Sequence, residues 1–148
     1  MSSHLSVGVI GLGAMGMGMA QSLRRAGHVV NVFDVRSEVA QKFAAEGGVA
    51  CASLEAVAAA SDILVSVVVN AVQTESVLFG DGTGASGCAK HLKPGSVFVM
   101  CSTVDPAFSV GLEKRLTDLG LLYIDAPISG GAAKAASGQM TMVTAGTP

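Results

Sequence analysis

The sequence is poor in charged and in aromatic residues. Charged residues make up 14% of its 148 residues, aromatic residues make up 4%, and tryptophan is absent. Lys and Arg together number 9 against 11 Asp and Glu, which leaves a formal net charge of −2. Proteins that bind nucleic acids present a basic face to the phosphates, so this balance argues against a nucleic-acid partner.

Long hydrophobic runs are also missing, although half of the residues are apolar. The longest runs, residues 63–69 and 97–101, fall far short of the roughly 20 residues that a membrane helix requires. The N-terminus shows no basic region followed by a long apolar stretch, so we expect neither a secretory signal nor a membrane partner. The three cysteines cannot all pair, and their spacing matches no zinc-ligand pattern. We therefore expect reduced thiols, no metal site and a cytoplasmic protein.

Glycine, by contrast, is abundant and accounts for 19 of the 148 residues, where an average protein has roughly 7%. Many glycines follow apolar segments, a placement typical of turns and close backbone approaches. Apolar, β-branched segments predict strands at residues 5–10, 29–33, 63–69, 96–100, 121–124 and 140–144, with a weaker one near residue 49. Helical spacing and composition predict helices at residues 15–25, 38–46, 54–60, 71–78, 106–119 and 132–137.

The alternation of strands and helices predicts one α/β domain over residues 1–148, a doubly wound, mostly parallel sheet with helices on both faces. Ligands of such sheets bind beyond the carboxyl ends of the strands. The segments of interest are therefore residues 11–16, 34–36, 69–72, 101–105 and 125–131. Residues 80–87 are rich in glycine but lack the Lys of a phosphate loop, so we interpret them as a mobile surface loop. Residues 127–131 are interpreted as a turn-rich loop.

Residues 11–16 read Gly-Leu-Gly-Ala-Met-Gly and match the G-x-G-x-x-G fingerprint of dinucleotide-binding domains. The match follows a predicted strand, opens a predicted helix and precedes Asp34, which lies 21 residues after Gly13. The first glycine permits a tight turn, the second lets a pyrophosphate approach, and the third lets helix and strand pack closely. Free N–H groups at the helix start then face the phosphates, unless the segment is a turn that binds nothing. The pattern predicts a Rossmann-type nucleotide site at Gly11, Leu12, Gly13, Ala14, Met15 and Gly16.

Asp34 stands at the end of the second predicted strand, next to Val35 and Arg36. A carboxylate at this position accepts hydrogen bonds from the hydroxyls of the adenine ribose and repels the 2′-phosphate of NADP. We therefore predict NAD as the cofactor in preference to NADP, with Asp34, Val35 and Arg36 in the site. Arg36 leaves an alternative open, because its guanidinium can stack on adenine or reach a phosphate. Asp34 can also be a plain cap of the helix that starts near Ser37.

Three motifs together resemble one enzyme family. They are the glycine turn, Cys-Ser-Thr-Val-Asp-Pro at residues 101–106, and Asp-Ala-Pro-Ile-Ser-Gly-Gly at residues 125–131, followed by Gly138 and Met140. Their order and spacing are similar to those of the β-hydroxyacid dehydrogenases, which include 3-hydroxyisobutyrate dehydrogenase, tartronate semialdehyde reductase and, more distantly, 6-phosphogluconate dehydrogenase. The resemblance covers essentially the whole chain. Residues 68–71 and 131–137 look most like the members that oxidise L-threonate.

The resemblance implies an oxidoreductase that transfers hydride between a small β-hydroxy acid and a nicotinamide cofactor. It places Thr103 beside the nicotinamide and Val69 and Asn70 next to the cofactor, although Asn70 stands where the family often has a Leu-Pro pair. The substrate loop that it implies comprises Ser129, Gly130 and Gly131. From the residues alone, Thr103 can equally cap the following helix, and residues 129–131 can be a turn after Pro127.

The family's catalytic Lys belongs to a Gly-x-x-x-Lys-x-x-Asn motif on a helix beyond the nucleotide domain. Lys134 falls inside the substrate-loop motif and has Ser137 at the Asn position, so we expect no catalytic base in this chain. We expect this chain to be the N-terminal domain of a longer, homo-oligomeric enzyme, without the all-helical C-terminal domain of that enzyme. We expect the chain to be inactive alone and to self-associate through exposed apolar surface. The alternatives are an NADP-dependent tartronate or succinic semialdehyde reductase, and a stand-alone nucleotide-sensing module.

Overall fold

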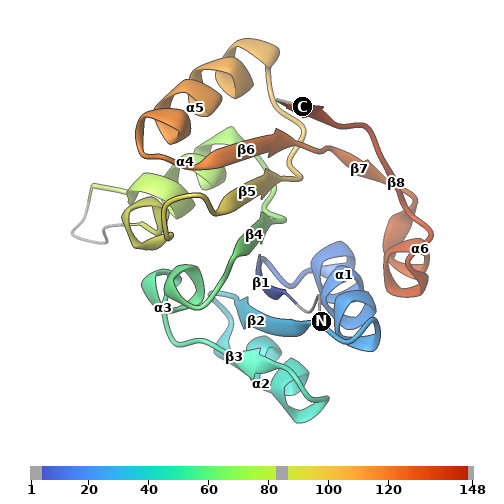
Figure 1. Ribbon diagram of the computed structural model, residues 1–148. Coiled ribbons are helices and arrows are strands. Elements are labelled where there is room, and N and C mark those ends of the chain that lie inside the picture. The colour runs from blue at the N-terminus through green and yellow to red at the C-terminus, as the bar shows by residue number, and fades with distance from the viewer. Residues whose placement is uncertain (1–4, 83–86, 147–148) are drawn as a thin grey trace.

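The computed structural model describes residues 5–82 and 87–146, and a seven-stranded sheet forms its centre (Figure 1). The strands are β1 (Ser6–Ile10), β2 (Val29–Phe33), β3 (Val49–Ala50), β4 (Ile63–Ser66), β5 (Val97–Met100), β6 (Leu122–Asp125), β7 (Ile128–Ser129), β8 (Thr141–Met142) and β9 (Ala145–Gly146). Strands β7 and β8 form a separate two-stranded sheet, and the order in the main sheet is β3-β2-β1-β4-β5-β6-β9. The first six of these strands run parallel, and β9 pairs antiparallel with β6 at one edge.

Helices cover both faces of this sheet, which confirms the predicted doubly wound fold. They are α1 (Ala14–Arg25), α2 (Ser37–Ala45), α3 (Leu54–Ala59), α4 (Ala71–Phe79), the 3-10 turn η1 (Ala89–His91), α5 (Pro106–Asp118) and α6 (Gly131–Ser137). The buried side chains of α3, α4, η1 and α5 pack against one face, and those of α1, α2 and α6 pack against the other (Figure 1). The two cores meet at the sheet, whose strands are short and rich in Val, Ile and Leu.

Local chemistry explains where several helices start. Asp105 caps α5 by accepting a hydrogen bond from the Ala107 N–H at 2.8 Å, and Pro106 occupies the first helical position, as the sequence predicts. Asn70 caps α4, because its Oδ1 accepts from the Gln73 N–H at 2.9 Å while Gln73 Oε1 accepts from the Val69 N–H at 2.9 Å. This reciprocal cap gives Asn70 a structural role at a position where the family that the sequence resembles often has proline.

The sequence prediction is wrong in three places. The strand predicted at residues 63–69 ends at Ser66, and residues 67–69, which follow it, line a cavity. The loop predicted at residues 127–131 contains β7. Of the strand predicted at residues 140–144, only Thr141–Met142 forms a strand, β8, and β9 follows it at Ala145–Gly146 with a different partner. The turn η1 has no counterpart in the prediction. Of the loop predicted at residues 80–87, residues 83–86 lie outside the described part of the chain.

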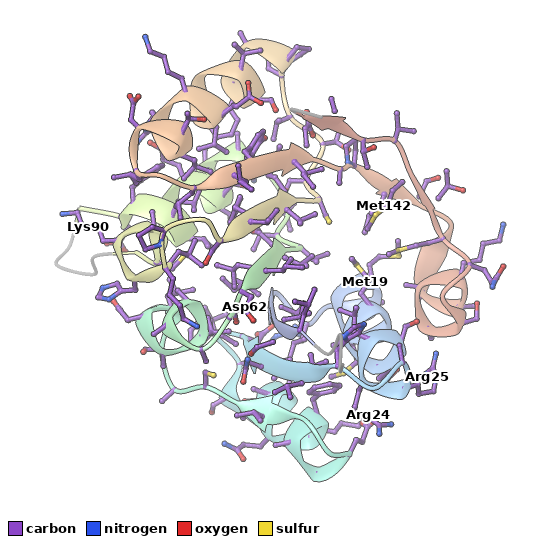
Figure 2. All side chains as sticks on the ribbon, in the orientation of Figure 1. Met19, Arg24, Arg25, Asp62, Lys90 and Met142 are labelled. Carbon is purple, nitrogen blue, oxygen red and sulfur yellow. The ribbon has the colours of Figure 1, made fainter. Side chains whose placement is uncertain are left out.

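The segment from β7 to β8 leaves the main sheet and crosses to α1, where α6 packs (Figure 1). A Cβ added at Gly18 would lie 2.7 Å from the backbone nitrogen of Ala136, so glycine permits the close approach of the two helices. Arg24 and Arg25 project from the C-terminal end of α1 in Figure 2, and Arg25 Nη2 donates to the carbonyl oxygen of Ala136. Gly138 ends α6 in a left-handed conformation.

Candidate nucleotide site

The three glycines of the turn after β1 differ in what surrounds them. Gly11 has φ +93°, and a Cβ there would overlap the carbonyl oxygen of Val67. A Cβ at Gly16 would overlap the carbonyl oxygen of Gly11, so the fold itself requires both of these glycines. Gly13 has φ −65°, and no heavy atom lies within 4 Å of a Cβ built there. Its missing side chain therefore leaves open space at the sheet edge.

The start of α1 presents backbone donors to this open space. Its first intrahelical hydrogen bond runs from the Met17 N–H to the Gly13 carbonyl oxygen at 2.8 Å. The N–H groups of residues 14–16 therefore precede the helical ladder and have no acceptor within it. Gly13 is the N-cap residue and offers no side chain to cap them. Such a helix start, with the positive end of its dipole, suits an anion.

Asp34, at the end of β2, is held by four N–H donors. Its Oδ1 accepts from the Arg36 N–H at 2.8 Å and from Arg36 Nε at 3.0 Å. Its Oδ2 accepts from the Leu12 N–H at 2.7 Å and from Arg36 Nη2 at 3.1 Å. The carboxylate therefore ties the glycine turn to the residue that starts α2. The sequence places Asp34 and Arg36 in the site, but it does not reveal this bidentate pair.

The charge of Asp34 is stabilised by these contacts. Burial by itself raises the pKa of a carboxyl group, but the hydrogen bonds from Arg36 and Leu12 and the guanidinium charge outweigh it, and the pKa of Asp34 lies below its ordinary value. The same pairing raises the pKa of Arg36. Both groups are therefore charged at neutral pH.

A cavity of about 510 Å³ opens beside the turn, at the carboxyl ends of β1, β2 and β4. Six residues named from the sequence line it: Gly11, Gly13, Asp34, Val35, Arg36 and Val69. The prediction missed the rest of the lining, which is mainly apolar: Ile10, Phe33, Leu54, Val67, Val68, Gln73, Ser76, Val77 and Asp81. Two of these were accessible to sequence reasoning, because Leu54 and Gln73 lie in the first turns of helices that start at this sheet edge.

The other six residues predicted near the cofactor do not line the cavity: Leu12, Ala14, Met15, Gly16, Asn70 and Thr103. The Leu12 side chain is buried in the core, and its N–H is bound to Asp34. Ala14 and Met15 lie in the first turn of α1, where their N–H groups face the open end. The Asn70 side chain serves as the cap of α4 described above.

Thr103 is exposed in the loop between β5 and α5, whose first two residues, Cys101 and Ser102, are buried. Its neighbour Ser102 fixes this loop, because Ser102 Oγ donates to the Val68 carbonyl oxygen at 2.6 Å. The loops that follow β4 and β5 are thus joined at the carboxyl edge of the sheet. Thr103 stands at the same edge as the cavity without belonging to its lining.

Ser129, Gly130 and Gly131 are exposed at the start of α6. Gly130 and Gly131 have φ values of +124° and +78°, which favour glycine. A Cβ added at Gly130 would lie 3.1 Å from Cδ of Lys134, so the aliphatic stem of this lysine folds back over the loop. The loop leads directly into α6, so the packing of α6 on α1 fixes its position.

The cysteines offer no nucleophile to the site. Burial raises the pKa of Cys88 and of Cys101 to about 12, and that of Cys51 is also raised by burial. These thiols are protonated at neutral pH, and the thiolate is the reactive form. Within residues 5–82 and 87–146, His, Cys, Asp and Glu form no group of three or more that could hold a metal ion. No helix in the same ranges is long and apolar enough to span a membrane.

Comparison with known proteins agrees with this geometry. Residues 6–148 match the family profile described as the NAD binding domain of 6-phosphogluconate dehydrogenase. The chain is 53% identical over 141 residues to L-threonate dehydrogenase of Cupriavidus necator, covering 95% of this chain and 46% of that protein. The crystal structure of 3-hydroxyisobutyrate dehydrogenase from Salmonella typhimurium superposes with a TM-score of 0.88 at 42% identity, covering 95% of this chain and 47% of the other.

A third relative, Psf3, was solved in complex with NADP+ and 2-OPP, and it matches with a TM-score of 0.87 at 27% identity over 96% of this chain and 49% of that one. The fold and the glycine turn define a Rossmann-type dinucleotide-binding domain. The chain belongs to the β-hydroxyacid dehydrogenase family, as its NAD-binding domain, and it is similar to the L-threonate and 3-hydroxyisobutyrate dehydrogenases. It spans about half the length of these relatives.

Proposed function

We propose that the domain binds NAD in the cavity beside the glycine turn and serves an enzyme that transfers hydride to or from a small β-hydroxy acid. The observation that carries this proposal is the contrast among the three glycines. The fold requires Gly11 and Gly16, whereas neither backbone conformation nor packing requires Gly13. A glycine that the unliganded fold does not need, at a helix start, leaves room for a ligand to approach the backbone.

The residues around the cavity suit the parts of a dinucleotide. The free N–H groups of residues 14–16 suit the pyrophosphate, and Asp34 suits the adenine ribose. Val35 and Val69 line the cavity with 90% and 77% of their surface exposed, which suits a flat aromatic ring. Thr103 and Asn70 lie further along the same edge, on the side where we place the nicotinamide. When bound, the nicotinamide accepts or returns the hydride, and the protein supplies its position.

NAD is proposed in preference to NADP because Asp34 is charged and would repel a 2′-phosphate. The lowered pKa of this carboxyl group supports the charge. The second candidate, an NADP-dependent semialdehyde reductase of the same family, is favoured by the Arg36 side chain, which is 54% exposed and can turn toward a phosphate. The NADP+ complex of Psf3 shows that relatives of this fold bind the phosphorylated cofactor.

The substrate class is proposed from the loop at residues 129–131. A serine hydroxyl and unhindered glycine N–H groups are donors suited to a small carboxylate. The high identity with a protein named L-threonate dehydrogenase favours L-threonate as the hydroxy acid. The proposed partner is therefore a small molecule, the substrate of a longer parent enzyme that we expect to be homo-oligomeric.

The test of nucleotide binding replaces Gly13 with valine. Because no heavy atom lies within 4 Å of the added Cβ, Gly13→Val should keep the fold, with a small loss of stability because valine is a poorer N-cap residue than glycine. The valine methyls obstruct the pyrophosphate, so NAD affinity should fall by at least about tenfold, roughly 1.4 kcal/mol. The matched control is Gly111→Val in α5, where a Cβ also meets nothing within 4 Å. Calorimetric titration with NAD should distinguish the two variants, and equal affinities in both would exclude this turn as the site.

We also predict that the 148-residue chain binds NAD without turnover. Removal of hydride from a hydroxyl carbon needs a base for the hydroxyl proton, and no Lys or His lines the cavity within the described residues. Lys134 is exposed on α6, away from that lining. The measurement is NADH absorbance with L-threonate or 3-hydroxyisobutyrate. Sustained NADH production would contradict the prediction, and Lys134→Ala would then show whether this lysine is the base.

A further inference from the structure

The Asp34 carboxylate has its hydrogen-bonding capacity filled before any nucleotide binds. A carboxylate offers about four acceptor positions, and four N–H groups occupy them at 2.7 to 3.1 Å. Two of the four come from the Arg36 guanidinium. The Asp34 side chain is only 6% exposed beneath a guanidinium side chain that is 54% exposed. Arg36 therefore lies between the carboxylate and the solvent, where a ribose must arrive.

The four donors differ in how readily they can leave. The Leu12 N–H belongs to the glycine turn, which is fixed by the hydrogen bond from the Gly11 N–H to the Phe33 carbonyl oxygen at 3.0 Å. The Arg36 N–H belongs to the residue that starts α2, whose carbonyl oxygen accepts from the Val39 N–H at 3.0 Å. The guanidinium is carried instead by a long, half-exposed side chain. A ribose brings two hydroxyl donors, as many as the guanidinium would withdraw.

We propose that Arg36 is a latch on the ribose site and thereby sets the choice between NAD and NADP, a proposal that rests on the proposed function. The ribose of NAD displaces the guanidinium from Asp34 and gives it no anion in return, so the latch lowers NAD affinity. The 2′-phosphate of NADP gives the displaced guanidinium a new partner, so the same residue raises NADP affinity. Removing the guanidinium must therefore change the two affinities in opposite directions.

The experiment is a calorimetric titration of the unaltered chain and two variants with NAD and with NADP. Arg36→Gln should bind NAD about threefold to fivefold more tightly, the range of a half-exposed ion pair, and NADP at least roughly tenfold more weakly. Arg36→Lys keeps the charge but loses the planar fork that grips both carboxylate oxygens. It should bind NAD more tightly than the unaltered chain and retain most of the NADP affinity.

The control is Arg115→Gln, which removes another ion pair of the same chemistry, Arg115 Nη1 to Glu75 Oε1 at 2.7 Å, outside the cavity lining. It should leave both affinities unchanged. In a nitrogen-edited NMR spectrum, the Nε–H signal of Arg36 should shift on NAD addition, while that of Arg115 stays in place.

The outcomes separate the two proposals. If the unaltered chain binds neither nucleotide, the proposed function is wrong and the latch falls with it. If the chain binds NAD but Arg36→Gln leaves NAD affinity unchanged or weakens it, the proposed function stands and the latch is overturned, because Arg36 then does not oppose the ribose. An unshifted Arg36 Nε–H signal at saturating NAD would also overturn it.

Discussion

The side of the sheet formed by β1 and β2 is buried on both faces, whereas the side formed by β5 and β6 is buried on one. In β1 residues 7–10 are all buried, and in β2 residues 30–32 are. In β5 Phe98 is fully buried while the next residue, Val99, is half-buried. In β6 Leu122 is 55% exposed. Parallel strands are normally covered on both faces, so the β5–β6 side is left incomplete within the described residues.

The difference separates the two tasks that we assign to the domain. The glycine turn and Asp34 follow β1 and β2, the strands that are buried on both faces, so the proposed nucleotide site rests on the more completely packed side. The proposed substrate loop, residues 129–131, follows β6 and leads into α6, which packs on α1. We therefore expect substitutions on the β1–β2 side to affect folding more strongly than matched ones on the β5–β6 side.

The largest effect expected is from an aromatic side chain on the completed side. Phe43 of α2 has no exposed surface and packs with the core that contains Val9 and Val32. Phe43→Ala should lower the free energy of unfolding by about 3–5 kcal/mol, since it leaves a large cavity. Leu122→Ala on the other side should lower it by less than about 1 kcal/mol. Urea denaturation measures both, and similar losses would refute the comparison.

A smaller effect tests the link between the two sides. Gly18→Ala places a methyl group 2.7 Å from the Ala136 nitrogen and 3.0 Å from the Ala135 side chain, so α6 must shift and stability should fall by about 1–3 kcal/mol. The control, Gly111→Ala, lies in a helix where the added Cβ meets nothing within 4 Å. It should raise stability by about 0.5–1 kcal/mol, because alanine favours helix over glycine. Thermal melts should therefore move in opposite directions, and a shared direction would show that α6 is not held at Gly18.

The smallest effect concerns self-association through the bare face of β5 and β6. We expect the chain to associate as its concentration rises, because Leu122 is 55% exposed and Val99, on the same face, is only half-buried. Leu122→Lys should weaken the association about tenfold, or ~1.4 kcal/mol. Val110→Lys, at a residue 69% exposed on α5, is the control on the opposite face and should change little. Sedimentation velocity over a concentration series gives the constants, and a monomeric unaltered chain would remove the basis for this prediction.

Most of the fold was predictable because its helices and strands are long enough to show a periodic pattern of apolar residues. The helix α5, for example, carries both a cap signal at Asp105 and an apolar stripe, and its start was predicted at Pro106. Two-residue strands such as β7 and β9 have no period, and they form because a partner strand lies alongside them. The end of β4 was missed for a related reason, since its run of valines continues past the last paired residue, Ser66.

The site was predictable where residue type alone decides the chemistry. Gly11, Gly13 and Asp34 follow from the fingerprint and its context, and all three line the cavity. The orientation of a long side chain is decided by its neighbours in space, so the pairing of Arg36 with Asp34 could not be read from spacing. The cap formed by Asn70 had a local signal, the Gln three residues later.

The contact between α1 and α6 forms late during synthesis, because the two helices lie far apart in the chain. Arg25 and Ala136, which are hydrogen-bonded, are 111 residues apart in the chain. At a synthesis rate of about 5–20 residues per second, roughly 6 to 22 s pass between their appearances at the ribosome. The turn, α1 and β2 have emerged well before α6 does, and the flank of α1 at Gly18 waits uncovered during that interval. A newly made chain therefore presents this flank to chaperones for longer than any surface that neighbouring elements cover at once.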